Sequence, residues 1–570
     1  MSALDFVVLI GTMLGIAAYG IWRTRGHRDL NTYLRGAGHT HWFAIGLSVM
    51  ATQASAITFL STPGQGYLGG LGFVQIYFGL PIALIIIAAA FLPIYRRLNV
   101  YTAYEFLGKR FDSKTRLLGT SLFLLQRGLG AGLTIYAPAI VLSSVFGWPL
   151  NLTILSSGLL VVIYVVFGGS DAVTLTQKYQ LTVIFAGMFT AFCLLLIKLP
   201  PGLHFTDALA LAGGFHKLEA VNFSPNPHER YTLWSGVLGG TFLMLSYFGA
   251  DQSQVQRYIS GESLRESRLG LMFNAVCKIP MQFSILLLGV MVFVFYQFER
   301  PPLFFNAASG HYLAEHHEDQ QLRAFEMDFS TAHAQTRQQL EAWLQARHGG
   351  DQSAATAAFA AASAAHRQGE IVRDEAAKAL QAANPGTTAN DADYVFITFI
   401  LDYLPHGVIG LLVTAFFAAA LSAKAAELNA LGSSTTVDVY RHIIKREATD
   451  AHYVVASKCF TAFWGLVAIG FALYAHLVEN LIQAVNILGS IFYGVILGLF
   501  VVAFFVRRIG GTAVFWGALV AQALIFVLYF TLTISYLWFP LIGCAACVVF
   551  SLGLQAALGG RIPTDEMRAT

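Results

Sequence analysis

Apolar runs long enough to cross a membrane fill most of this sequence. A helix needs roughly 20 apolar residues to span a bilayer, and only helices and closed barrels satisfy their own backbone in lipid. The runs cover residues 5–22, 41–59, 73–93, 117–146, 150–167, 181–199, 234–249, 269–298, 394–431, 456–475, 481–506, 512–532 and 537–558. They predict an all-α polytopic membrane protein with about 13 transmembrane helices.

The composition agrees with a membrane protein and with no other broad class. Of the 570 residues, 56% are hydrophobic and 12% are charged, whereas soluble domains average about 25% charged residues. The sequence carries no metalloprotease, hydrolase or phosphate-loop motif, so we expect neither an enzyme nor a nucleic-acid partner. All five cysteines lie in apolar runs, which predicts buried small side chains.

Basic residues follow the odd-numbered apolar runs. This set comprises Arg23, Arg25, Arg28, Arg35, Arg96, Arg97, Lys109, Arg110, Lys114, Arg116, Lys178, Arg257, Arg265, Arg268, Arg441, Lys445, Arg446, Arg507 and Arg508. Cytoplasmic loops carry an excess of Lys and Arg. We therefore predict an N-terminus outside, a C-terminus in the cytoplasm, and a location in a bacterial inner (plasma) membrane.

Residues 48–72 form an apolar run whose middle is unsuited to lipid. Its polar and helix-interrupting members are Thr52, Gln53, Ser55, Thr58, Ser61, Thr62, Pro63, Gly64, Gly66, Gly69, Gly70 and Gly72. A polar, Gly/Pro-interrupted span indicates the ligand site of a transporter, because the freed backbone groups must find partners. A kinked packing helix with small residues at a helix contact is the alternative.

A second segment of this kind occurs five spans later. In residues 234–251, Ser246 to Gly249 precede the charged Asp251 within an apolar run. An inverted repeat places a partner of the first broken helix at this distance. The pair favours a ligand site over simple packing.

Residues 299–393 are the one long soluble segment, and we expect them to face outward. The stretches 325–347 and 354–383 predict two helices separated by Gly349 and Gly350. The histidine-rich group at residues 311–319 has no fixed ligand spacing and is typical of a solvated loop. The chain therefore divides into residues 1–298 with a leading helix and seven core helices, the insertion 299–393, and the remaining helices of 394–570.

Five blocks carry a resemblance to a known family. They are LPIYRRLNVYTAYEFLGKRFD (92–112), GGSDAVTLTQKYQ (168–180), YFGADQSQVQRYISG (247–261), LPHGVIGLLVTAFFAAALSAKAAELNALGSSTTVDVYRH (404–442) and LIQAVNILGS (481–490). The chain resembles the solute:sodium symporter family, which includes sodium/glucose, sodium/monocarboxylate and sodium/multivitamin cotransporters. The resemblance implies a five-plus-five inverted repeat with broken first and sixth core helices.

The resemblance also implies a sodium ion as the coupling ion. Its ligands would be the carbonyl oxygens of Ala51, Ala54 and Ala419 and the hydroxyl of Ser422, and oxygen ligands suit such a hard cation. The family's second hydroxyl position is Ala423 here, which weakens the predicted site.

Two further positions bear on the number of sodium ions. Gln177 stands where the family's additional sodium site has an Asp, so we expect one sodium per transport cycle. Lys424 lies on the opposite side of the helix from the face shared by Ala419, Ser422, Ala423 and Ala426, at about 100° per residue, so helix geometry argues against its replacing the ion. An ion pair between Lys424 and Glu427 is the better interpretation.

The matching of family motifs gives a candidate solute site. Its residues are Gln53, Tyr77, Asp251, Lys278 and Gln483, where Tyr77 replaces an expected Glu and Asp251 an expected Asn. A carboxylate solute would equally favour Lys278 or Arg127, and mutual pairing of Asp251 with Lys278 is an alternative role for both.

These features together predict a sodium-coupled symporter that imports a small polar organic solute by alternating access. The first candidate for the solute is a sugar or sugar derivative, and the second is a small organic acid. A proton-coupled transporter, an uncoupled transporter and a transporter-fold sensor are also compatible with the sequence. The insertion lies outside the repeat, so we expect it to be dispensable for transport.

Overall fold

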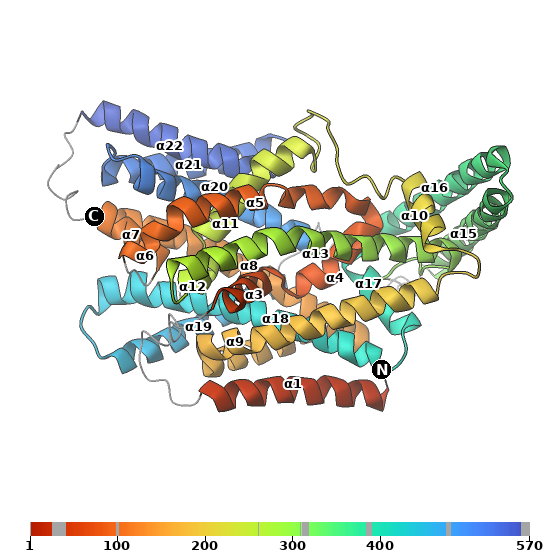
Figure 1. The fold of residues 1–570 in the computed structure, drawn as a ribbon, viewed down its shortest axis with the longest axis horizontal. Helices are drawn as coiled ribbons and strands as arrows, with labels where there is room; N and C mark the ends of the chain where they lie inside the picture. Colours follow the sequence, from red (N-terminus) through yellow and green to blue (C-terminus); the bar gives the residue numbers. More distant parts are fainter. Residues whose placement is uncertain are drawn as a thin grey trace.

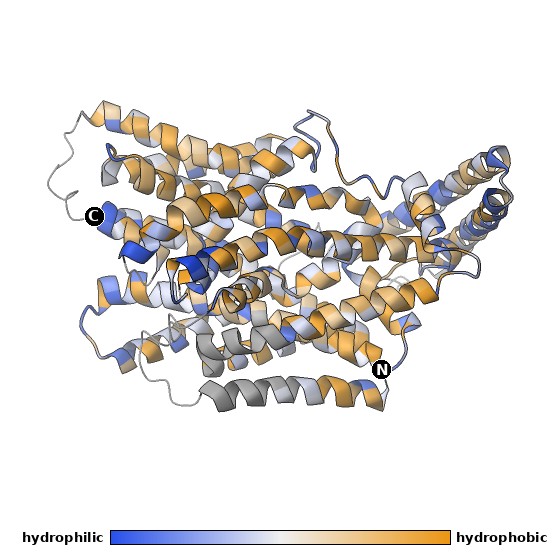
Figure 2. Ribbon diagram, in the orientation of Figure 1, coloured by the Kyte–Doolittle hydropathy of each residue, from blue (hydrophilic) through white to orange (hydrophobic). Residues whose placement is uncertain are grey.

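The computed structural model describes residues 2–24, 41–98, 102–259, 261–307, 309, 319–383, 390–474 and 480–559. The side chains of residues 13–14, 16–24, 98, 167–179, 319 and 422 fall outside this description. The described chain is built from helices that run side by side in a bundle (Figure 1). Hydrophobic residues dominate these helices, whereas the projecting α15 (Asp319–His348) and α16 (Gln352–Ala383) carry more hydrophilic ones (Figure 2).

Nine helical stretches among the described residues are long and apolar enough to cross a membrane. They contain α4 (Ala56–Gly69) to α6 (Leu92–Leu98), α8 (Ser113–Phe146), the end of α9 (Leu150–Ile197), α13 (Leu264–Phe298), α18 (Val408–Ser434), α19 (Asp450–Tyr474), α20 (Leu481–Phe505), α21 (Gly511–Thr531) and α22 (Trp538–Leu558). The start of α1 (Ala3–Thr24), α3 (Trp42–Gln53) and the start of α9 are shorter apolar helices. The predicted all-helical membrane fold is confirmed.

Two predicted boundaries differ from the structure. The run 394–431 is two helices, α17 (Ala392–Tyr403) and α18, because Pro405 cannot continue a helix and Gly407 has a φ of +88°. The runs 150–167 and 181–199 belong to the single helical element α9. Apolar runs alone do not show either difference, because a run of apolar residues can contain a helix end, and a helix can continue through a polar stretch such as residues 168–180.

Both predicted broken helices are broken. The first core helix consists of α3 and α4, with Ala54 and Ser55 between them. The second consists of α11 (Gly240–Gly249) and α12 (Gln252–Ile259), with Ala250 and Asp251 between them. Each interruption exposes backbone groups in the middle of the bundle, where protein, water or a ligand must satisfy them.

The Pro and Gly residues of the first broken helix do not make its break. Pro63 lies inside α4, nine residues beyond Ala54. A Cβ on Gly64 would lie 1.9 Å from the Ala392 carbonyl oxygen, and one on Gly66 would lie 2.4 Å from that of Leu286. These glycines therefore allow α17 and α13 to approach α4 closely, which is the packing role that small residues take in membranes.

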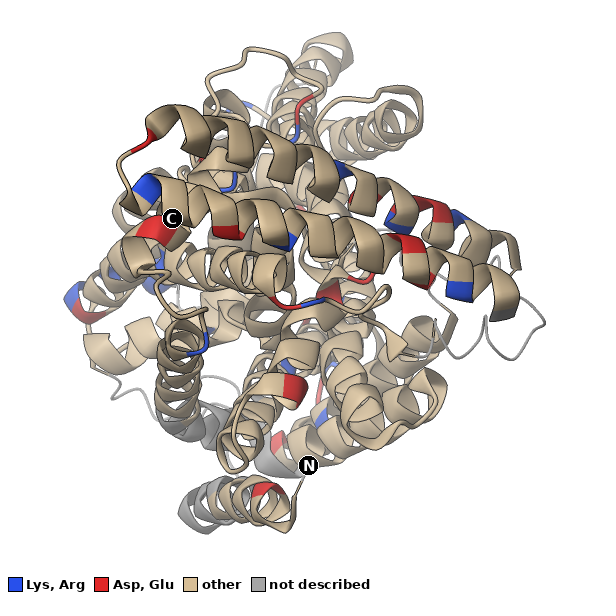
Figure 3. Cartoon of the chain, turned by 90° about the vertical axis from the view of Figure 1, so that its right-hand side faces the viewer, with Lys and Arg blue, Asp and Glu red and all other residues tan. Residues whose placement is uncertain are grey.

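The insertion folds as the predicted helical hairpin. Figure 3 shows α15 and α16 side by side across one end of the molecule, with both signs of charge along them. The hairpin is docked at several points. Arg347 Nε lies 3.0 Å from Asp207 Oδ1 on α10 (Phe205–Gly214), and Arg373 Nη2 lies 3.4 Å from both oxygens of Asp391. The histidine-rich group at residues 311–319 lies outside the described side chains.

The short helices complete the bundle. They are η1 (Gly70–Tyr77), α5 (Leu80–Ile86), η2 (Ile87–Phe91), α7 (Ala103–Arg110), η3 (Ser235–Gly239) and η4 (Thr435–Ile444). The chain turns between α4 and η1 at Gly70, which has a φ of +66°. Of the five cysteines, Cys544 and Cys547 are buried as predicted, but Cys459 is exposed on the surface of α19.

Candidate functional site

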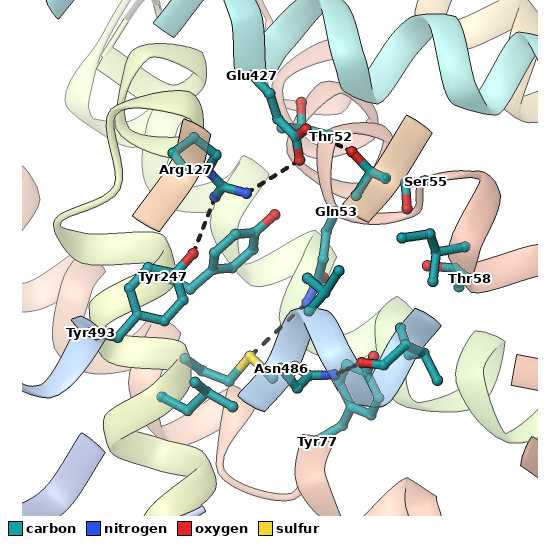
Figure 4. A pocket seen from close by; sticks show the side chains of 16 residues that line it. Thr52, Gln53, Ser55, Thr58, Tyr77, Arg127, Tyr247, Glu427, Asn486 and Tyr493 are labelled. Carbon is teal, nitrogen blue, oxygen red and sulfur yellow. Dashed lines mark hydrogen bonds and ion pairs between the residues drawn. The ribbon is translucent and has the colours of Figure 1, made fainter. Parts of the chain in front are cut away.

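A small polar cavity lies beside both helix breaks. It has a volume of about 80 Å³. Its polar lining consists of Thr52, Gln53, Ser55, Thr58, Tyr77, Arg127, Thr134, Tyr247, Glu427, Asn486 and Tyr493 (Figure 4). These side chains come from α3, α4, η1, α8, α11, α18 and α20, so residues distant in the sequence meet here. A concave site with a few convergent polar groups is where a small ligand binds.

The first helix break redirects backbone hydrogen bonds next to this cavity. Ser55 N–H donates to the Gln53 carbonyl at 3.0 Å, whereas a regular helix would direct it to Ala51. The Ala51 carbonyl thereby loses its usual helical donor. Ala51 and Ala54 are buried, and so is Ala419 on α18, which packs against both α3 and α4. The predicted sodium ligands therefore lie on helices in contact, although the Ser422 side chain falls outside the described part.

The second helix break is satisfied by the protein itself. The hydroxyl of Tyr258 donates to the Phe248 carbonyl at 2.9 Å, and that of Tyr95 to the Gly249 carbonyl at 2.7 Å. The Tyr104 hydroxyl donates to the Ala250 carbonyl at 2.9 Å. Three consecutive carbonyls at this break thus have tyrosine donors, so the protein itself satisfies them.

A chain of four buried charges connects the cavity to the second break. Arg127 on α8 forms ion pairs with Asp251 and with Glu427, the latter at 3.2 Å. Glu427 in turn lies 3.3 Å from Lys424 Nζ. All four residues are at most 5% exposed, and their charges sum to zero. Such balance is needed because an unpaired charge in a membrane interior is costly.

Asp251 also organises the backbone at its own break. Its Oδ1 accepts hydrogen bonds from the backbone N–H and the hydroxyl of Ser253, at 2.9 and 2.7 Å. Its Oδ2 accepts from Arg127 and from the Tyr493 hydroxyl, the latter at 3.0 Å. This one carboxylate therefore joins α8, α12 and α20.

The structure distributes the five predicted solute residues over four environments. Gln53 and Tyr77 line the cavity. Asp251 lies behind its wall, paired with Arg127 and not with Lys278. Lys278 is fully buried, with its Nζ 5.5 Å above the Tyr77 ring and no hydrogen-bond partner among the described residues. Gln483 is not among the residues that line the cavity, and its Nε2 donates to the Tyr231 hydroxyl at 3.1 Å.

Sequence reasoning missed several residues of the cavity wall. Tyr247, Asn486 and Tyr493 gave no signal, because isolated tyrosine and amide side chains are common in membrane helices. Arg127 and Glu427 did give one, since charges inside apolar spans are functional candidates by default. The predicted ion pair between Lys424 and Glu427 is present.

A membrane-spanning helical bundle with two broken helices around a polar cavity is the architecture of a secondary transporter. The chain belongs to the sodium:solute symporter family, whose model matches residues 33–308 and 369–521. This confirms the resemblance found in the sequence motifs. Residues 309–368, between the two matched stretches, include α15 and the first half of α16.

Individual relatives agree with the family match. The chain is 31% identical to the human sodium/iodide cotransporter over 300 residues, which are 52% of this chain and 46% of that protein. It is 35% identical to the human sodium-coupled monocarboxylate transporter 1 over 275 residues, 48% of this chain and 45% of that protein. The chain thus spans about half the length of the curated relatives it matches.

A solved structure supports the fold over the whole chain. A Na⁺-coupled sialic acid symporter, in a substrate-bound outward-open state, has a TM-score of 0.73 and 20% sequence identity to this chain. The alignment covers 98% of each chain. The inverted-repeat fold predicted from the two broken helices is thereby confirmed.

Proposed function

We propose that this protein is a symporter that imports a small polar organic solute together with sodium. The observation that carries the proposal is the first helix break, where the Ala51 carbonyl oxygen loses its helical hydrogen-bond donor beside a polar cavity. Family membership supports the same coupling ion. Sodium would bind the carbonyls of Ala51, Ala54 and Ala419 and the hydroxyl of Ser422.

Two features of the cavity favour a small carboxylate as the solute. The first is size, because a cavity of about 80 Å³ is small beside ligand pockets, which typically have about 300–1,000 Å³. That space suits a short organic acid better than a hexose. The second is the Arg127 guanidinium in the cavity wall, whose Nε has no hydrogen-bond partner among the described residues. An arginine binds a carboxylate through directional, charge-assisted hydrogen bonds.

A sugar or sugar derivative is the second candidate. Gln53 and Asn486 line the cavity, and amides supply the donors and acceptors that hydroxyl groups need. The buried Oε1 of Gln53 has no partner within the described structure, so a solute hydroxyl could donate to it. Sugar transport would require a cavity that widens in another state of the cycle.

Uptake by proteoliposomes under an inward sodium gradient separates the two candidates. We expect saturable uptake of labelled lactate or pyruvate, and no competition from glucose or galactose in excess. Saturable hexose uptake that short carboxylates fail to inhibit would reverse the choice of solute. Empty liposomes provide the background for both measurements.

A further inference from the structure

The contacts of Lys424 differ from those of a simple ion pair within one helix. Its side chain is 1% exposed, and its ammonium donates a hydrogen bond to the Ala131 carbonyl of α8. The same ammonium lies 3.3 Å from Glu427 Oε2. Lys424 therefore bridges α18 and α8 through two oxygens from different helices.

A third oxygen belongs to the same group. Oγ1 of Thr134 lies 3.1 Å from the Ala131 carbonyl oxygen and 3.1 Å from Glu427 Oε2. A carbonyl, a carboxylate and a hydroxyl oxygen thus lie together where the ammonium sits. Thr134 and Glu427 also line the cavity, so an ion could reach this place from it.

Such an oxygen set suits a hard cation as well as an ammonium. Hard cations take carboxylate, carbonyl and hydroxyl oxygens, with water completing the shell. The local charges balance only while Lys424 is present, because Asp251 and Glu427 oppose Arg127 and Lys424. Without the ammonium, one buried carboxylate would lack a counter-charge, which strongly favours uptake of another cation.

We propose that Lys424 occupies, with its own ammonium, a cation site formed by Ala131, Thr134 and Glu427. The site is separate from the sodium site predicted at Ala51, Ala54, Ala419 and Ser422, since Lys424 reaches toward α8 and not toward the first helix break. The ammonium of Lys424 supplies the positive charge that an alkali cation would otherwise supply at this site. The protein therefore requires one exchangeable cation fewer at this place.

Replacement of Lys424 by Met tests the site through sodium binding. Met keeps the apolar stem and removes the charge. The melting temperature of the purified full-length variant should rise more in sodium chloride than in choline chloride. This difference between the two salts should be larger for the variant than for the wild type. Lys424→Met/Glu427→Gln, which removes both charges, should return to the response of the wild type.

Two results would overturn the proposal. One is a Lys424→Met variant whose sodium response equals that of the wild type or of the double variant. The other is a variant that is unstable in choline and stays unstable in sodium. A variant that is unstable in choline but recovers in sodium supports the site.

Transport gives a second readout that rests on the proposed sodium coupling. The Hill coefficient for sodium should rise from about 1 in the wild type to about 2 in Lys424→Met, because it is limited by the number of sites. A wild type without sodium-dependent transport would contradict the proposed function. It would leave the sodium-dependent melting of the variant as a separate test of the cation site.

Discussion

At the scale of single residues, Ala423 is the position that most affects the proposed sodium site. It is 1% exposed on α18, next to Ser422, and it stands where family motifs have a second hydroxyl. The four proposed ligands are three carbonyls and one hydroxyl. A missing ligand lowers affinity without abolishing the site.

Ala423→Ser should increase the affinity for sodium. A hydroxyl that binds a desolvated cation contributes about 1–3 kcal/mol, by analogy with hydrogen bonds to charged groups. The half-saturating sodium concentration should fall about ten-fold, which corresponds to about 1.4 kcal/mol. Ser422→Ala should raise it, and solute binding without sodium should stay unchanged. Sodium titrations of uptake measure the effects of both substitutions. If the two variants give the same titration curve, sodium binds elsewhere.

The residue-level predictions from sequence succeeded where one helix determined the outcome. The Lys424–Glu427 pair follows from helical spacing alone, and the structure contains it. The partner of Asp251 could not be found in this way, because Arg127 and Lys278 are both buried cations on other helices. Only the packing of α8 against the second break decides between them.

At the scale of elements, the α15–α16 hairpin is docked through groups that titrate. His366 on α16 packs its ring against Phe215 and Phe293, with centroid distances of 5.1 and 5.5 Å. Burial lowers the pKa of His366 to about 4, helped by the positive charges of Lys217, His333 and Arg373. Burial likewise lowers the pKa of His333.

Docking of the hairpin should weaken as the pH falls from about 6.5 toward 4. The released His366 binds a proton near its ordinary pKa, whereas the docked one binds it only near pH 4. The released state thus holds more protons in this window and gains stability there, by at most about 3 kcal/mol. Above about pH 6.5 docking should be constant.

Limited proteolysis of the hairpin across this pH range measures the effect. Cleavage should increase on acidification in the wild type and less so in His366→Gln. The Asp207 contact does not act in the same window. Burial raises its pKa, but hydrogen bonds from His348 and Arg347 bring it below the ordinary value. Equal acid sensitivity in the two proteins would contradict the role of His366.

The sequence predicted which segments form helices and which helices are broken, but it did not predict every helix boundary. Polar residues correctly marked residues 48–72 as a broken helix, but Pro63 and Gly64 suggested the wrong place for the break. Pro63 lies inside α4, and Gly64 and Gly66 are small because α17 and α13 approach α4 there. A sequence shows that small residues are needed but not whether a turn or a neighbouring helix requires them.

At the scale of the whole molecule, the two broken helices meet at one cavity but are not equivalent. Tyrosine hydroxyls satisfy the carbonyls at the second break, whereas the Ala51 carbonyl at the first break loses its helical donor, and α18 packs against the helices on both sides of that break. The charge chain from Lys424 to Asp251 links the second break to the cavity. This asymmetry supports the proposed sodium site at the first break, whereas the second break is held by the protein's own side chains.

The central claim is that sodium drives solute accumulation. Uptake of a transported carboxylate into proteoliposomes, with sodium outside and choline inside, measures it most directly. We expect accumulation above the external concentration, which disappears when sodium is equal on both sides or when an ionophore dissipates the gradient. Equal uptake with and without a sodium gradient, or accumulation driven by a proton gradient alone, would contradict it.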